Sequence, residues 1–128
     1  MSEIKTDKLT GVGTAGVIVV TGEGNSTTTN LQQGLVKAWA ETNNTGTSIL
    51  DSFNIASLVD TSTGQQTCNY TNDFASNNYP VVTTGETVGN ISVAAGSSSG
   101  SWITYSFNAG TSAYLDMYMC TIAAGDLA

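Results

Sequence analysis

The stretch "SWITYSFN", residues 101–108, sets the fold class of this chain. Ile103, Tyr105 and Phe107 recur at every second position and so share one face of an extended segment. A two-residue period is typical of a β-strand, and aromatic and β-branched side chains favour that conformation. Turn-forming stretches, "GSSSG" before it and "AGTS" after it, bound the segment. The sequence therefore predicts a strand here, between two short connections.

Similar short runs fill most of the chain, divided by Gly-, Ser- and Asn-rich turns at the spacing of about 8–12 residues that is typical of sandwiches and barrels. The predicted strands are 17–21, 35–42, two within 47–60 divided by a bend near 52–54, 65–71, 80–85, 87–95, 101–108 and 112–122. The predicted turns are 43–46, 61–64, 96–100 and 109–112. We expect an all-β fold, either a small antiparallel β-sandwich with a jelly-roll-like arrangement or a small barrel.

The chain divides into two parts of different character. Residues 1–34 have too few apolar side chains to fold alone, and they are expected to form an extended N-terminal segment. The apolar residues that lead up to Trp39 fit the spacing of a helix, but the same segment also alternates like a strand. Gly34 weakens the helix. We therefore expect a short helical turn or extended start, then a strand over 35–42. Residues 35–128 are expected to form the β-sandwich domain.

The segment "LTGVGTAGVIVV", residues 9–20, contains the G-x-G-x-x-G spacing of dinucleotide-binding turns at Gly11, Gly13 and Gly16. That site needs a helix after the glycines, because the pyrophosphate sits on the helix N-terminus. The β-branched run 17–20 resists helix formation. The glycines are therefore interpreted as a bend between extended segments, and we expect no cofactor.

Composition argues against several function classes. Of the 128 residues, 10% are charged, His and Arg are absent, and the net charge is −7. A Ser-His-Asp or Cys-His arrangement cannot form without histidine, so no enzyme and no catalytic residues are predicted. A negative chain repels phosphate, so nucleic acid is not an expected partner. Because there is no apolar run of 18 residues and no signal-peptide pattern, neither membrane insertion nor export by a leader is expected.

Three further groups of residues are candidate sites. Cys68 and Cys120 form no C-x-x-C unit, so zinc is not indicated, and they are interpreted as buried apolar residues unless the fold pairs them. Acids near bends and turns suggest paired glycosidase carboxylates or a cation site, but such acids more often cap backbone groups. These acids are Asp51, Asp60 and Asp116. A sugar-stacking platform competes with core or interface roles for the aromatic residues Trp39, Trp102, Tyr79, Tyr105, Tyr114 and Tyr118.

An ordered series of short motifs resembles a C-terminal domain of tail-fibre and fibre-like virion proteins of marine bacteriophages, those of cyanobacteria and other ocean bacteria. The motifs are "VKAW" (36–39), "NTG" (44–46), "DSFNIAS" (51–57), "TGQQTCNYT" (63–71), "NYPVV" (78–82) and the closing "GDLA" (125–128). The resemblance covers residues 31–128 well and the first 30 loosely. One departure is "QQTCN", where relatives tend to carry an aromatic residue before the apolar pair of the strand.

This resemblance implies a virion protein, assembled in the host cytoplasm, that is usually homotrimeric and carries no catalytic residues. The leading hypothesis is a short trimeric fibre whose residues 1–34 attach to other virion proteins. Its head domain, residues 35–128, would then bind a glycan or protein of the host surface. A capsid decoration or head-fibre protein is the second hypothesis. A carbohydrate-binding lectin or glycan-active enzyme is the third.

Overall fold

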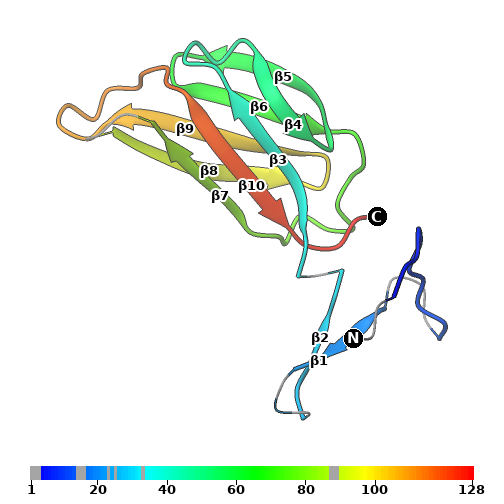
Figure 1. Cartoon of the computed structure of the whole chain (residues 1–128). Coiled ribbons are helices and arrows are strands. Elements are labelled where there is room, and N and C mark those ends of the chain that lie inside the picture. Colours follow the sequence, from blue (N-terminus) through cyan, green and yellow to red (C-terminus); the bar gives the residue numbers. More distant parts are fainter. Residues whose placement is uncertain (1–3, 14–16, 23, 25, 33, 87–89) are drawn as a thin grey trace. The chain divides into compact units, whose positions relative to one another are not determined.

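The computed structural model describes residues 4–13, 17–22, 24, 26–32, 34–86 and 90–128. All regular structure in these residues is antiparallel β-strand, as the sequence predicted (Figure 1). The chain forms two compact units, Met1–Leu35 and Val36–Ala128. The boundary lies one residue after the one expected from the sequence.

The described residues of the N-terminal unit contain one small hairpin. Strand β1 (Val19–Thr21) pairs with β2 (Thr28–Asn30), and the Gly22 amide donates to the Thr27 carbonyl at 2.8 Å across the connection. The strand predicted at 17–21 is therefore shorter, and its partner comes from a following polar segment in which no strand was predicted. Thr28 and Thr29 suit an extended backbone, although the segment is too polar to be buried.

Two four-stranded sheets make up the second unit (Figure 1). Their order is β4-β3-β10-β7 in one, here called the β3 sheet, and β5-β6-β9-β8 in the other, the β9 sheet. The strands are β3 (Val36–Thr42), β4 (Ile49–Phe53), β5 (Ile55–Ser62), β6 (Gln65–Tyr70), β7 (Val81–Gly85), β8 (Asn90–Ser98), β9 (Ser101–Asn108) and β10 (Met119–Ala124). Because buried side chains of both sheets form one core, the unit is sandwich-like.

The predicted bend between β4 and β5 is confirmed at a single residue. Asn54 has a φ of 60°, in the left-handed region that asparagine tolerates better than most residues. Its side chain accepts the Asn72 amide at 2.8 Å and donates to the Asn72 carbonyl at 3.0 Å. This local pairing lets the chain pass from the edge of the β3 sheet into the edge of the β9 sheet.

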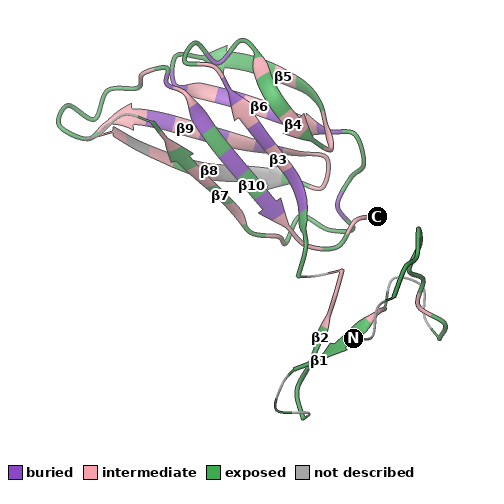
Figure 2. Cartoon of the chain, in the orientation of Figure 1, coloured by how far each residue is buried: buried purple, intermediate pink, exposed green. Residues whose placement is uncertain are grey.

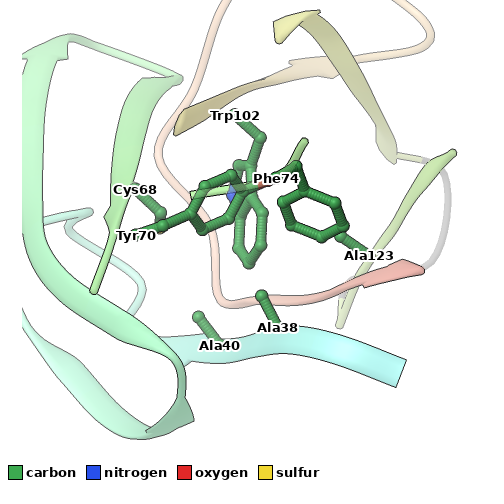
Figure 3. Packing of buried hydrophobic residues seen from close by; sticks show 7 residues of the cluster. All are labelled: Ala38, Ala40, Cys68, Tyr70, Phe74, Trp102 and Ala123. Atoms are coloured by element: carbon green, nitrogen blue, oxygen red, sulfur yellow. The ribbon is translucent and has the colours of Figure 1, made fainter. Parts of the chain in front are cut away.

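In the core, small residues of the β3 sheet pack against large residues of the β9 sheet and of the loop that follows β6. Ala38 and Ala40 point towards the rings of Tyr70, Phe74 and Trp102 (Figure 3). The Tyr70 ring lies 5.0 Å from Phe74 and 5.4 Å from Trp102 between centroids. Because alanine leaves room at an intersheet contact, the aromatic rings can fill the space between the sheets.

Strand β9 has the predicted bounds and two-residue period. Its two faces differ in burial. Trp102, Thr104 and Ser106 are buried, whereas the face shared by Ile103, Tyr105 and Phe107 is only half-buried. The more apolar face of the strand is therefore the outer one. Trp102 anchors the inner face, and the hydroxyl of Ser106 is satisfied there by donating to the Leu115 carbonyl at 2.7 Å.

The strand predicted at 112–122 is wrong in its first half. Residues 112–118 form a connection in which only Tyr114 makes an isolated bridge, and β10 begins at Met119. Ser112 has a φ of 55°, which breaks an extended backbone. The strand predicted at 87–95 is β8, which runs from Asn90 to Ser98, and residues 87–89 lie outside the described part of the chain.

Candidate interaction surfaces

An apolar row crosses the outer face of the β3 sheet. Strand register aligns Phe53 with Trp39, Trp39 with Ile122, and Ile122 with Val82. Phe53, Ile122 and Val82 are 54%, 48% and 62% exposed, and Trp39 is half-buried. These four residues, here called the outer row, give every strand of the sheet one apolar side chain at the same level. Such a row is a candidate surface for association.

A polar row runs beside the outer row. Here the register aligns Asp51 with Glu41, Glu41 with Cys120, and Cys120 with Thr84. The pKa of Cys120 is raised, first by partial burial and then by the negative charges of Glu41 and Glu86. The prediction that both cysteines are buried therefore holds for Cys68 alone. Both thiols are free, because Cys120 points away from the core that contains Cys68.

The outer face of the β9 sheet carries a second candidate surface. Tyr114 bridges to Phe107, and its ring centroid lies 6.3 Å from those of both Phe107 and Tyr105. These three residues, here called the aromatic cluster, include the 59% exposed Tyr114. Exposed rings at this spacing can stack on a sugar or pack against another protein.

The aromatic residues weighed as one sugar platform are divided among separate places. Trp102 is 1% exposed in the core, and the Tyr79 ring stacks on Phe74 with centroids 4.0 Å apart. Trp39 belongs to the outer row on the other sheet. Tyr118 is half-buried before β10. Only Tyr105 and Tyr114 meet on a surface. Phe107, which the sequence placed on the same strand face as Tyr105 but not among the candidate binding residues, completes their cluster.

The three acids weighed as carboxylate partners also separate. Asp51 lies on the outer face of the β3 sheet, whereas Asp60 and Asp116 line one small pocket. Within the described residues, no group of three or more His, Cys, Asp or Glu side chains is placed to hold a metal ion. The described part of the chain also contains no helix long and apolar enough to cross a membrane.

The glycine motif is not followed by a helix within the described residues. Gly11 and Gly13 lie in irregular backbone, Gly16 lies outside the described part, and the next regular element is strand β1. Comparison of the chain with protein-family models, with curated proteins and with solved structures gives no match. The surfaces themselves therefore provide the basis for a functional proposal.

The N-terminal unit provides the third candidate surface. Every described residue from 4 to 35 is exposed or half-buried, as Figure 2 shows. Its exposed apolar side chains include Ile4, Leu9 and Val12, at 87%, 61% and 104%. A two-stranded hairpin without a packed face is marginally stable by itself. This unit therefore has the properties of a segment that is ordered by contact with another chain.

Proposed function

We propose that this protein is a structural component of a bacteriophage particle, a short homotrimeric fibre with the Val36–Ala128 unit as its head domain. The observation that carries the proposal is the N-terminal unit, which exposes apolar side chains and buries none of its described residues. Such a segment gains a core by packing against identical copies or against another virion protein. The motif series that resembles phage fibre domains supports the same assignment.

The head domain offers one surface for the association of copies and another for binding to the host surface. The outer row gives identical copies an apolar strip on which to associate, as a trimer requires. The aromatic cluster gives a host glycan or protein rings on which to stack. A jelly-roll-like arrangement stays part of the proposal. The eight strands lie in two four-stranded sheets and the connections β4–β5, β6–β7, β7–β8 and β9–β10 cross between them, while β3–β4, β5–β6 and β8–β9 are hairpins within one sheet.

Immunogold electron microscopy of intact particles tests the virion assignment. Label at the tail is the expected result. Label over the head surface would favour the second hypothesis, a capsid decoration or head-fibre protein, which the small size of the chain also suits. A protein absent from purified particles would contradict both.

A lectin is the candidate from another class, and the aromatic cluster is the observation that favours it. A glycan array compares the wild-type chain with Tyr114→Ala, which removes the most exposed ring of the cluster. Binding that depends on Tyr114, in a protein absent from particles, would favour the lectin over the fibre. We expect no release of reducing sugar in a parallel hydrolysis assay.

A further inference from the structure

The outer face of the β3 sheet has apolar and acidic side chains in neighbouring rows. Beside the outer row, the polar row takes one residue from each strand: Asp51, Glu41, Cys120 and Thr84. Asp51 on β4 and Glu41 on β3 lie directly opposite each other. Like charges in that position repel each other, so a cation brought from outside the sheet would stabilise the pair.

Glu86 adds a third negative charge to this face. It follows β7 and is exposed, and after partial burial of the thiol, the charges of Glu41 and Glu86 raise the pKa of Cys120. The Val36–Ala128 unit has little positive charge of its own to offset these acids. Its sequence has seven acidic residues against one lysine, a net charge of −6, and that lysine, Lys37, is only 8% exposed. A cation for this face therefore has to come from another segment.

The two other lysines of the chain lie close together in the N-terminal unit. Lys5 and Lys8 are exposed, and residues 4–13 carry a net charge of +1. The same stretch exposes the apolar side chains of Ile4 and Leu9. It therefore offers the two kinds of side chain, cationic and apolar, that are complementary to the polar row and to the outer row.

We propose that the outer face of the β3 sheet binds residues 4–13 of a second copy of this chain. Ile4 and Leu9 of that copy pack on the outer row, and its Lys5 and Lys8 pair with the acids of the polar row. The same face of another copy is a poorer occupant, because two such faces packed together would enclose acids from both copies without a cation. This inference rests on the association of copies proposed above and names the segment that makes the contact.

Charge reversal tests this contact. Lys5→Glu with Lys8→Glu changes only exposed side chains, so the fold should be unchanged while the dissociation constant of association rises about tenfold or more. Glu41→Lys with Asp51→Lys should weaken association similarly. A chain with all four reversals should regain the wild-type mass, because its N-terminal segment is then acidic and its sheet face basic. Light scattering over a dilution series measures each mass, and circular dichroism verifies that each variant is folded.

Asp60→Lys with Asp73→Lys is the matched control. These exposed acids lie on β5 and in the loop after β6, so the charge changes equally but away from the β3 sheet. This control should associate like the wild type and should not rescue the lysine variant. A wild-type oligomer whose mass is unaffected by Lys5→Glu with Lys8→Glu would overturn this inference and leave the proposed fibre standing. A monomeric wild type would contradict both.

Chemical coupling shows whether the contact joins two chains. A carbodiimide links a lysine amine to a carboxylate that touches it, and a mixture of unlabelled and isotopically labelled wild-type chains distinguishes links between chains from links within one chain. We expect mass spectrometry to find peptides that join Lys5 or Lys8 of one chain to Glu86 or a polar-row acid of another. Coupling confined to single chains, or to acids away from this face, would overturn the inference.

Discussion

Two glycines with left-handed backbone angles lie in turns at the small pocket that Asp60 and Asp116 line. Gly46 has a φ of 67° and Gly64 a φ of 70°, a region that L-residues enter at a cost of roughly 1–2 kcal/mol. Their surroundings differ. A Cβ atom on Gly46 would meet nothing closer than 3.9 Å, whereas one on Gly64 would overlap the Ser106 carbonyl and lie 2.9 Å from the Leu115 amide nitrogen.

Alanine at these two positions should therefore separate backbone strain from steric overlap. We expect Gly46→Ala to lower the free energy of unfolding by about 1–2 kcal/mol and Gly64→Ala by about 3 kcal/mol or more. The added overlap involves backbone atoms, which cannot rotate away. Urea unfolding of both variants measures the difference. Equal losses in the two variants would mean that Gly64 is not packed as described.

The buried thiol of Cys68 predicts a pH dependence of stability. The pKa of Cys68 is raised to about 12. Burial raises it, and the neighbouring Trp102 side chain lowers it by a smaller amount. Because the thiolate forms near pH 9 only in the unfolded chain, the contribution of Cys68 is complete below pH 9 and is lost as pH rises towards 12. Burial raises the pKa of Tyr70 as well, which gives a loss of the same sign above pH 10.

Unfolding by urea at pH 8 to 11 tests this linkage. The wild type should lose up to about 1.4 kcal/mol per pH unit above pH 9 through Cys68. Cys68→Ala should start from a lower stability, because it leaves a cavity, but should lose less between pH 9 and 10. Cys120→Ala is the control and should follow the wild type more closely. Parallel curves for wild type and Cys68→Ala would contradict the burial of this thiol.

Strands show what alternation can and cannot predict. The bounds of β9 and β6 follow closely from their two-residue period, and the bend at Asn54 follows from polar residues between two apolar runs. Which face is buried does not follow, because β9 has aromatic residues on both faces. The sequence predicts a strand over 112–118 because the segment carries several apolar residues. These residues do make contacts in the fold. Met117 is buried there and Tyr114 packs on Phe107, but the segment forms no ladder.

Substitution on the two faces of β9 tests this assignment. Trp102→Ala should lower the free energy of unfolding by about 3–5 kcal/mol, because it empties the centre of the core. Tyr105→Ala should cost about 1 kcal/mol or less, since its side chain lies on the outer face. Chemical denaturation at low protein concentration keeps association from masking the comparison. The reverse order would place the Ile103, Tyr105 and Phe107 face inside.

The whole molecule combines a packed sandwich with apolar surface that it does not cover. The outer row was beyond sequence reasoning, because its members come from four strands and only the register aligns them. The sequence suggested a pair of carboxylates among Asp51, Asp60 and Asp116, but it could not predict that Asp60 and Asp116 line one pocket, since they lie far apart in the chain. Exposed apolar side chains in both units are the physical reason for proposing that identical copies associate, and the resemblance to phage fibres supplies the number three.

Light scattering coupled to size exclusion measures the native mass of the full chain and tests that proposal most directly. One chain has a mass of 13.2 kDa, so three copies give three times that value, 39.6 kDa. We expect 39.6 kDa for the wild type, and a shift towards smaller species for Trp39→Ser, which makes the outer row polar at its centre. A wild-type mass of 13.2 kDa at micromolar concentration would contradict assembly through these surfaces.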